Sequence, residues 1–420
     1  MSGGVYKTGE PTPVRRDRSV RPVTWRCRQQ VTGRVAGATG VTGNVEPPSF
    51  TVGIEEEFKI VDLETRDLVR DLPDGMMEEI ADRAEGQVGP EFMRSQIEVG
   101  TPVCASIKEA RRELAKLRSA VAEVAAVHGL APISASTHPF AAWTDQLNTD
   151  KERYNALAEA MGGVARRLLI SGMHVHAGIE DEELRIDLMN QVSYFMPHLL
   201  AISTSSPFWH GIETGLKSYR TSVFRALPRT GLLDEFSSWT EYRRHVDVLM
   251  QAGVIEDATK LWWDLRPSDR YPTLEMRASD ICTNIDDGMT VAATYLSLLR
   301  MLYRSRMGNQ RWRQYSRMLL SENTWRAQRY GTSDGLIDFG KGTIVPYADL
   351  YNEMMVILAD DAAALDCVEE MEHGRVILER GTSADRQLDV YHRSLAEGAT
   401  QIEALRAVVD FLVEETVAGL

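Results

Sequence analysis

The chain has 420 residues, of which 43% are hydrophobic and 26% charged, a composition typical of a globular protein with a sizeable core. Its formal net charge of −14 argues against a general nucleic-acid-binding protein, which needs basic surface against phosphates. The four cysteines lie far apart and no run approaches the roughly eighteen apolar residues of a membrane span. We therefore expect a protein of the reducing cytoplasm, with no membrane and no nucleic-acid partner.

Residues 1–48 differ in composition from the rest of the chain. They are rich in Arg, Gly, Thr and Val, poor in acidic residues, and without hydrophobic periodicity. Because such a segment cannot bury a core, we predict a disordered N-terminal extension before a single domain over residues 49–420. The basic character also suits an organellar transit peptide, although a dispensable leader is the simpler interpretation.

From Ser49 onward the pattern predicts an α+β fold with a helical C-terminal third. Strand-like runs cover residues 51–61, 131–137, 170–179, 261–266 and 273–279. Helical spacing covers residues 106–128, 150–168, 181–203, 239–251, 286–308, 347–365 and 384–417. Gly129 follows the first of these helices as a natural C-terminal stop.

Polar side chains share one face of several strands, because alternate residues of a strand point to opposite sides. In residues 51–61 one face is apolar and is interrupted only by Glu56. The opposite faces of four short stretches carry these neighbouring pairs: Glu55 and Glu57, Gln96 and Glu98, His174 and His176, and Glu275 and Arg277. Any one of these stretches could be an ordinary solvated face, but the four together indicate a site.

If the four stretches belong to one sheet, its polar face carries at least four carboxylates and two imidazoles. Such crowding raises carboxylate pKa values and costs stability unless cations neutralise it. Clusters rich in oxygen suit Mg²⁺, which proteins hold through a few carboxylates together with substrate phosphates. The pattern therefore predicts a metal-dependent site.

Arginine supplies the complementary charge. Residues 217–231 contain no acidic residue and four cations, namely Lys217, Arg220, Arg225 and Arg229. Pro228 and Gly231 favour a loop over a long helix, and such a segment could clamp a phosphate or a carboxylate. A turn around residues 268–272 further predicts a hairpin that places Arg266 beside Glu275 or Arg277.

Several common catalytic motifs are absent from the sequence. There is no G-x-x-x-x-G-K-[ST] loop, no G-x-G-x-x-G fingerprint after a strand and no G-x-S-x-G elbow. If ATP is used, metal and arginine must bind it rather than a glycine-rich loop. Cys104 is expected to be a buried free cysteine and not a nucleophile.

The motifs together resemble a known family. The strings G-I-E-E-E-F, Q-I-E-V-G-T-P, S-T-H-P-F, S-G-M-H-V-H-A-G, L-W-W-D-L-R-P, L-E-M-R-A-S-D, R-Y-G and E-R-G-T-S-A-D-R-Q occur in this order. In order and spacing they are similar to the type 2 glutamate–cysteine ligases, also called bacterial carboxylate–amine ligases, from about residue 50 to near 415. The resemblance implies a fold related to glutamine synthetase, in which a curved, mostly antiparallel sheet forms a funnel with helices packed outside.

The resemblance also implies a reaction. ATP would phosphorylate a side-chain carboxylate, classically the γ-carboxylate of L-glutamate, and an amine, classically that of L-cysteine, would displace phosphate to form an amide. ATP and Mg²⁺ would be required, with Mn²⁺ able to substitute, and the partners would be small carboxylate and amine substrates. The sequence leaves a homo-oligomer open.

The family resemblance also implies roles for individual residues. The resemblance implies metal-binding carboxylates at Glu55, Glu57 and Glu98, with His174 and Glu275 as further metal or phosphate neighbours. It implies a catalytic group of Arg277, Glu275 and His174, in which Arg277 stabilises charge on the transferring phosphoryl group. We expect contacts to substrate or ATP from the remaining polar residues of these stretches, namely Gln96, His176, Arg220, Arg225, Arg229 and Arg266.

Two other functions fit parts of the sequence. A strand bearing His-x-His also begins metal-dependent amidohydrolases, which bind Zn²⁺ with imidazoles at the strand ends of a (β/α)₈ barrel. The remaining histidines fall mostly in predicted helices, and the alternation of strands and helices does not reach eight. A catalytically weak, nucleotide-binding scaffold is the other alternative, and the intact set of polar residues argues against it.

Overall fold

The computed structural model describes residues 47–420, apart from the side chain of Arg153, and residues 1–46 of the predicted disordered extension lie outside this range. The main sheet has seven strands in the order β10–β11–β5–β1–β3–β2, with β4 beside β1. All of its described pairings are antiparallel. The strands are β1 (Val52–Asp62), β2 (Val88–Pro90), β3 (Gln96–Gly100), β4 (Leu130–Ile133), β5 (Met173–Gly178), β10 (Leu265–Pro267) and β11 (Thr273–Met276).

Three two-stranded ribbons lie outside the main sheet. They pair β6 (Phe208–Trp209) with β7 (Ile212–Glu213), β8 (Thr230–Gly231) with β9 (Trp262–Trp263), and β12 (Gly335–Asp338) with β13 (Thr343–Pro346). The short 3₁₀ helices are η1 (Trp143–Asp145), η2 (Gly162–Arg167), η3 (Ser193–Phe195) and η4 (Ala258–Lys260).

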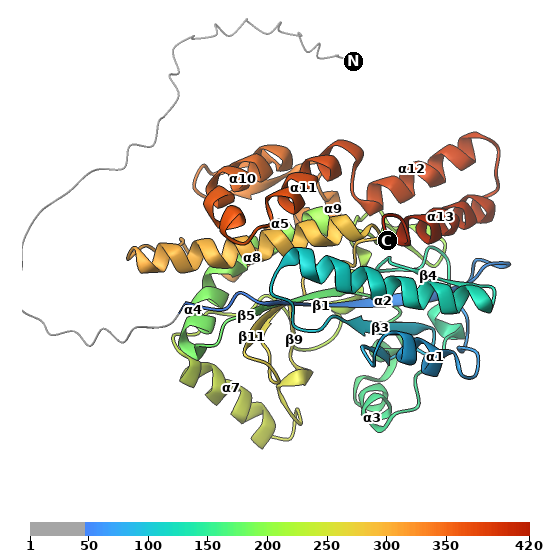
Figure 1. The fold of residues 1–420 in the computed structure, drawn as a ribbon, viewed down its shortest axis with the longest axis horizontal. Helices are drawn as coiled ribbons and strands as arrows, with labels where there is room; N and C mark the ends of the chain where they lie inside the picture. The colour runs from blue at the N-terminus through green and yellow to red at the C-terminus, as the bar shows by residue number, and fades with distance from the viewer. Residues whose placement is uncertain (1–46) are drawn as a thin grey trace, which may run out of the picture. The chain divides into compact units, whose positions relative to one another are not determined.

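Helices cover one face of the main sheet, and α2 and α8 pack directly against β1 and β5. In Figure 1 the C-terminal helices lie on this same side, whereas α3 and α7 lie on the other side of the sheet. The helices are α1 (Met76–Arg83), α2 (Ile107–Val127), α3 (Glu152–Met161), α4 (Glu182–Val192), α5 (Met196–Ser203), α6 (Tyr219–Phe224), α7 (Trp239–Gln251), α8 (Ile285–Met307), α9 (Arg317–Tyr330), α10 (Tyr347–Ala364), α11 (Val368–Arg380), α12 (Ser383–Ala396) and α13 (Gln401–Thr416). The predicted α+β architecture with a helical C-terminal third is confirmed.

Most predicted elements recur with shifted ends, and local chemistry explains the shifts. The strand expected over 131–137 ends at Ile133, because the next amides bond to side chains instead: Ser134 N donates to Thr416 Oγ1 and Ser136 N to Ser205 Oγ. The single helix expected over 384–417 is wrong, since Gly398 adopts φ +98° and separates α12 from α13. Within residues 47–420, no helix is both long and apolar enough to cross a membrane.

The two faces of β1 are buried against different surroundings. Val52, Ile54, Phe58 and Ile60 are almost fully buried among the apolar residues beneath the helices. Glu56 points to the same side and is also fully buried, where both of its oxygens accept hydrogen bonds from Arg118 of α2, at 2.7 and 2.8 Å. The one polar interruption of the apolar face is therefore a buried ion pair, which leaves Glu55 and Glu57 on the opposite face.

Replacing Arg118 by methionine is expected to lower the free energy of unfolding by about 3–5 kcal/mol, because it leaves the Glu56 carboxylate buried without its cation. Arg118 also donates to the carbonyl oxygens of Cys282, Thr283 and Thr416, so the loss includes these bonds. Urea denaturation of the full-length variant measures the change. A loss below about 1 kcal/mol would mean that water or another cation reaches Glu56.

Candidate active site

The strand register brings the polar pairs of four strands together on one face of the sheet. Across β1 and β5, Glu55 lies opposite His174, and across β1 and β3, Glu57 lies opposite Glu98. Glu275 of β11 lies opposite His176 of β5 on one side and opposite Arg266 of β10 on the other. The hairpin predicted to place Arg266 beside Glu275 is thus confirmed, and the predicted cluster of carboxylates and imidazoles lies on one surface.

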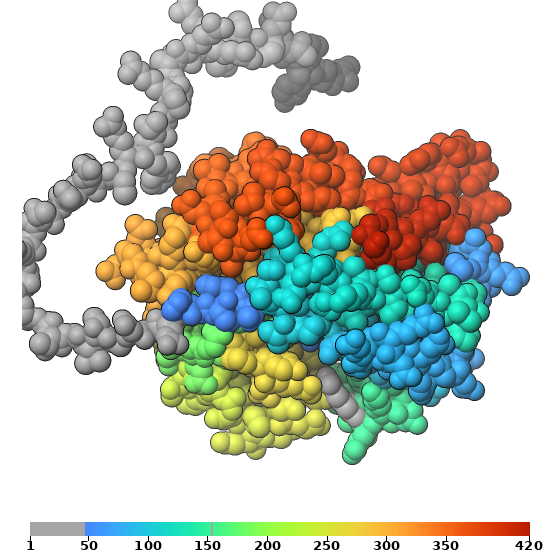
Figure 2. Space-filling view, viewed as in Figure 1, coloured from blue at the N-terminus to red at the C-terminus, as the bar shows by residue number. Residues whose placement is uncertain are grey.

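These side chains line a cavity of about 270 Å³ on the sheet face opposite the main helical layer. Two segments far apart in the sequence wall it, one around α3 and η2 and the other around η4, β9 and the β10–β11 turn. Figure 2 shows the green and yellow parts of the chain that carry these walls on the same side of the molecule. Of the predicted site residues, the lining includes Glu55, Glu57, Glu98, His174, His176, Arg220, Arg266, Glu275 and Arg277.

Glu55 lies at the centre of the cluster, between the two histidines. Its Oε2 is 3.0 Å from His174 Nδ1 and its Oε1 is 3.5 Å from His176 Nε2. Burial opposes ionisation of Glu55, but the hydrogen bond to His174 and the nearby His176 imidazole outweigh it and lower the pKa of this carboxyl. Glu55 is therefore an anion over the whole physiological range.

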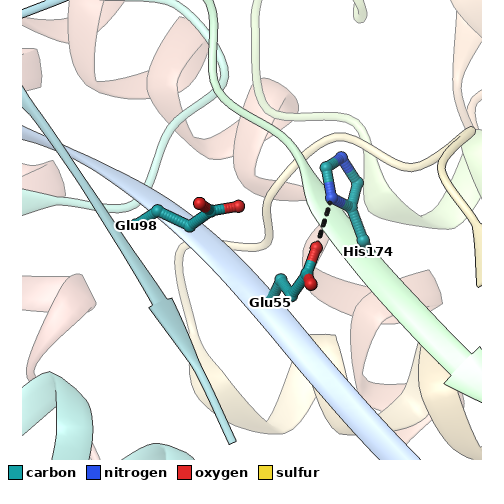
Figure 3. A group of neighbouring side chains, drawn as sticks. All are labelled: Glu55, Glu98 and His174. Atoms are coloured by element: carbon teal, nitrogen blue, oxygen red, sulfur yellow. Dashed lines mark hydrogen bonds and ion pairs between the residues drawn. The ribbon is translucent and has the colours of Figure 1, made fainter. Parts of the chain in front are cut away.

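The surroundings of Glu98 shift the pKa of its carboxyl in the opposite direction to that of Glu55. Figure 3 shows its carboxylate directed toward the space shared with Glu55 and His174. Burial and the charges of Glu91, Glu55 and Glu57 together raise the pKa of Glu98 well above its usual range. Within residues 47–420 this half-buried carboxyl has no hydrogen bond or ion pair of its own, and the charge of Arg277 opposes the shift only in part.

Arginines surround Glu275 on the other side of the cluster. Arg266 donates to both of its oxygens, from Nε at 2.9 Å and from Nη2 at 3.3 Å, and Arg277 Nη1 donates to Oε1. Burial opposes ionisation of Glu275, but Arg277 and Arg266 outweigh it and lower the pKa of the carboxyl. Arg277 keeps a buried Nε that has no partner among the described residues, so a donor remains for an incoming anion.

Two groups of these residues fit a divalent cation. In each, one donor atom per residue lies within 4.8 Å of the others, and the groups are Glu55, Glu98 and His174, and Glu55, His176 and Glu275. Two observations within residues 47–420 favour a cation: the Glu98 carboxylate lacks a partner, and the buried His176 Nε2 has no hydrogen-bond partner. Carboxylate oxygens with one imidazole suit Mg²⁺ or Mn²⁺.

Glu57 falls outside both groups although it lines the cavity. Its Oε2 accepts a hydrogen bond of 2.7 Å from the backbone N of Gly172. Its other oxygen, Oε1, lies 3.9 Å from His174 Nε2 and faces the first group. One oxygen of Glu57 thus remains for a cation.

Three residues predicted to contact substrate or ATP do not line the cavity. Gln96 is 1% exposed and donates to Ile170 O and Ser171 Oγ behind the cavity floor. Arg225 pairs with Asp264 at 3.4 Å, and Arg229 donates to Lys260 O and packs its guanidinium over Trp262. The structure therefore places these three side chains outside the cavity, with their observed contacts directed to other parts of the protein.

Arg266 lines the cavity, but its hydrogen bonds are already directed into the protein. Besides Glu275, its Nη1 donates to the carbonyl oxygens of Ala258, Thr259 and Leu261. It therefore ties the cavity wall around η4 to Glu275 rather than leaving donors for a ligand.

Arg220 crosses the cavity floor against the backbone of Gly172. Its side chain is 4% exposed, and Nη2 donates to Arg277 O. A Cβ placed on Gly172 would lie 2.6 Å from Arg220 Nη2, closer than any real contact. The absence of a side chain at residue 172 is therefore what lets Arg220 reach the floor.

Gly172→Ala is expected to displace the Arg220 guanidinium and to lower the free energy of unfolding by about 1–3 kcal/mol, the usual cost of overpacking. Because Gly172 N also donates to Glu57, any activity that depends on this carboxylate should fall as well. Denaturation curves and steady-state assays of one preparation measure both. Gly163→Ala is the control, since a Cβ there meets no atom within 4 Å.

The cavity also contains residues that sequence reasoning missed. Glu91 precedes β3 and adds a further carboxylate beside Glu98, and Lys260, Trp262, Arg270 and Tyr271 come from the wall around η4 and the β10–β11 turn. Of these residues, only Glu91 could have been identified from the sequence, by its charge and its position seven residues before Glu98. Cys104 is fully buried, and burial raises the pKa of its thiol, as expected for a cysteine that is no nucleophile.

Comparison with known proteins gives consistent matches over this part of the chain. The family model described as glutamate-cysteine ligase family 2 matches residues 51–410. A protein of Rhodospirillum rubrum is 59% identical over 377 residues, covering 89% of this chain and 97% of its own length. One of Paracoccus denitrificans is 51% identical over 370 residues, covering 88% and 98%. Both carry the provisional name glutamate–cysteine ligase 2.

Two solved structures share the fold at low identity. A Francisella tularensis glutamate–cysteine ligase in complex with AMP aligns with a TM-score of 0.60 at 14% identity, covering 88% of this chain and 89% of that one. A bifunctional glutathione synthetase of Pasteurella multocida aligns with a TM-score of 0.62 at 13% identity, covering 87% of this chain and 52% of that longer one. At this identity the likeness establishes the fold alone, and it confirms the predicted fold class.

Proposed function

Because the chain belongs to the glutamate–cysteine ligase family 2, we propose that it is an ATP- and Mg²⁺-dependent ligase that joins a carboxylate to an amine. The carboxylate substrate is the side-chain carboxylate of L-glutamate, and the amine is that of L-cysteine or another amino compound. The catalytic unit is a single domain over residues 49–420, acting in the cytoplasm.

The observation that supports this proposal best is the meeting of carboxylates, imidazoles and arginines at one cavity. Glu55 belongs to both candidate ligand groups, and Arg277 lies beside the second group with an unpartnered donor. Phosphoryl transfer needs positioning and charge neutralisation more than it needs a protein nucleophile. The charged residues of this cavity can supply both the positioning and the charge neutralisation. The family membership supports ligation over other uses of the same groups.

In the first step an oxygen of the substrate carboxylate attacks the γ-phosphorus of ATP. The bond from that phosphorus to the bridging oxygen breaks, ADP leaves with the electron pair, and an acyl phosphate forms. Mg²⁺, when bound, neutralises the phosphate oxygens and polarises the phosphorus. Glu55, Glu98 and His174 would hold one cation, with Glu57 Oε1 in reach, and Glu55, His176 and Glu275 a second; Arg277 would donate to the equatorial oxygens of the transferring group.

In the second step the amine nitrogen attacks the acyl carbon. The bond from that carbon to the phosphate oxygen breaks, inorganic phosphate leaves, and the nitrogen loses a proton to give the amide. One oxygen of the original carboxylate therefore departs in the phosphate. Arg220, buried at the cavity floor and near Arg277 O, provides positive charge on this side throughout.

An isotope experiment tests the two-step reaction. Release of ADP with glutamate and a panel of amines first identifies a productive pair. Glutamate labelled with ¹⁸O in its side-chain carboxylate should then transfer label to inorganic phosphate, read by mass spectrometry. Amide formed without label in phosphate would rule out the acyl phosphate. Nucleotide binding with no ADP release from any amine would instead favour the scaffold alternative.

The amidohydrolase alternative fails on the fold. Its His-x-His strand belongs to a (β/α)₈ barrel of parallel strands, whereas the main sheet here is antiparallel in every described pairing. His174 and His176 also face carboxylates of the neighbouring strands rather than a third imidazole within the described residues. The ligase therefore remains the function with the most support.

A further inference from the structure

Behind the cavity floor lies a buried polar group that the proposed reaction does not use. Lys59 follows Glu57 by two residues on the same face of β1 and is fully buried. Its ammonium donates to Ala135 O at 2.9 Å, Ser136 O at 3.1 Å and Ser171 Oγ at 2.7 Å. Among the described residues no carboxylate forms an ion pair with it, so this cation is held by three neutral oxygens.

Gln96 reaches the same serine from the next strand. It lies opposite Lys59 in the β1–β3 register, and its Nε2 donates to Ile170 O at 2.7 Å and to Ser171 Oγ at 3.0 Å. The Ser171 hydroxyl oxygen thus accepts two hydrogen bonds from two strands. Ser171 N in turn donates to Ser136 O at 2.9 Å, which fixes the backbone of the segment.

The segment fixed in this way ends on a residue of the active site. Gly172, next to Ser171, donates its N–H to Glu57 Oε2 at 2.7 Å, and Glu57 N donates to Gly172 O at 3.3 Å. The first bond engages one carboxylate oxygen and turns the other, Oε1, toward His174. The direction of the Glu57 carboxylate therefore depends on where Gly172 lies.

We propose that Ser171, with Lys59 and Gln96 that donate to its hydroxyl oxygen, is a positioning residue that aims the Glu57 carboxylate at the cation. This inference rests on the proposed function, because it assigns Glu57 Oε1 to a bound divalent ion. It also gives Gln96 a role in positioning in place of the predicted contact with substrate. Hydrogen bonds behind metal ligands commonly control affinity by fixing ligand direction.

The serine hydroxyl offers a cleaner test than the lysine. Burial lowers the pKa of Lys59 to about 7, while the Glu57 charge opposes that shift. Removing the ammonium would strengthen cation binding by deleting a positive charge and weaken it by releasing the segment, so the two effects oppose each other. Ser171→Ala and Gln96→Met remove no charged side chain, so their effect on cation binding comes through the hydrogen bonds.

The experiment measures Mn²⁺ binding to the full-length protein without ATP or substrates, from the electron paramagnetic resonance signal of the free ion. Ser171→Ala is expected to weaken Mn²⁺ binding about 10-fold, and Gln96→Met in the same direction. Ser134→Ala is the matched control, because Ser134 is equally buried in this layer and its hydroxyl has no partner within residues 47–420. The control should bind Mn²⁺ like the wild type.

A double-mutant cycle tests whether Ser171 acts through Glu57. In a Glu57→Gln background, Ser171→Ala should weaken Mn²⁺ binding no further; a full additional 10-fold loss would overturn the inference. Unchanged Mn²⁺ affinity in both Ser171→Ala and Gln96→Met would also overturn the inference. If Ser171→Ala does not fold, the Mn²⁺ affinity of Gln96→Met decides the test. Failure of the proposed function looks different, since then Glu55→Gln would leave Mn²⁺ binding of the protein unchanged.

Discussion

Glu55→Gln is expected to lower turnover by about 10²–10³-fold, the usual cost of losing one electrostatic group aimed at developing charge. Glu55 belongs to both candidate ligand groups, so the substitution weakens both cation positions at once. The amide keeps the size of the side chain and one acceptor oxygen, and it relieves repulsion with Glu98. The free energy of unfolding measured in EDTA should fall as well, because the two imidazoles that lower the pKa of Glu55 stabilise its charge in the folded protein.

Glu56→Gln is the matched control for this variant. It makes the same chemical change one residue along β1, on the face that packs under the helices against Arg118. Its folded fraction should turn over normally although its unfolding free energy falls, so this variant separates a loss of stability from a loss of turnover. Near-normal turnover of Glu55→Gln at limiting Mg²⁺ would exclude Glu55 as a ligand.

Arg277→Lys should lower the rate of phosphoryl transfer by about 10²–10³-fold while the dissociation constant for ATP changes only a few-fold. Lysine keeps the charge but not the planar guanidinium, and Arg277 uses Nη1 on Glu275 while Nε remains without a partner among the described residues. A single ammonium cannot hold Glu275 and an equatorial phosphate oxygen in the same geometry. Single-turnover ADP formation and equilibrium ATP binding measure the two quantities separately.

Arg300→Lys controls for the chemical change itself. Arg300 pairs with the buried Asp361 at 2.6 Å on the helical side of the molecule, where lysine can keep the ion pair. This variant should resemble the wild type in both measurements. Equal losses of ATP binding and of phosphoryl transfer in Arg277→Lys would instead assign Arg277 to binding the ground state.

The cavity face of the sheet could be predicted because a strand fixes side-chain direction locally. Alternation alone placed Glu55 and Glu57 opposite Ile54 and Phe58, and burial follows that division from Val52 to Phe58. The hairpin beside Glu275 could be predicted for a similar reason, since a short turn forces the pairing of its strands. Both predictions depend only on residues that are close together in the sequence.

Contacts between distant residues decide which of the predicted site residues line the cavity, and the sequence does not show those contacts. Gln96 has the polar alternation of a cavity residue, but the carbonyl of Ile170 and the hydroxyl of Ser171 capture its amide. The sequence around Arg225 and Arg229 predicts a phosphate clamp, yet Arg225 contacts Asp264 and Arg229 donates to the carbonyl of Lys260, outside the cavity. No local pattern shows which acceptor an arginine meets from another part of the chain.

The buried pair of Glu56 and Arg118 has a consequence for how the chain avoids misfolding. If β1 paired with its neighbours one residue out of step, Glu56 would enter the cavity and Glu55 and Glu57 would turn inward. Two carboxylates would then compete beneath the helices for the single guanidinium of Arg118, and one would stay buried without a cation, at a cost of about 3–5 kcal/mol. The run of three glutamates thus disfavours the slip of the central strand by one residue, which would exchange its two faces.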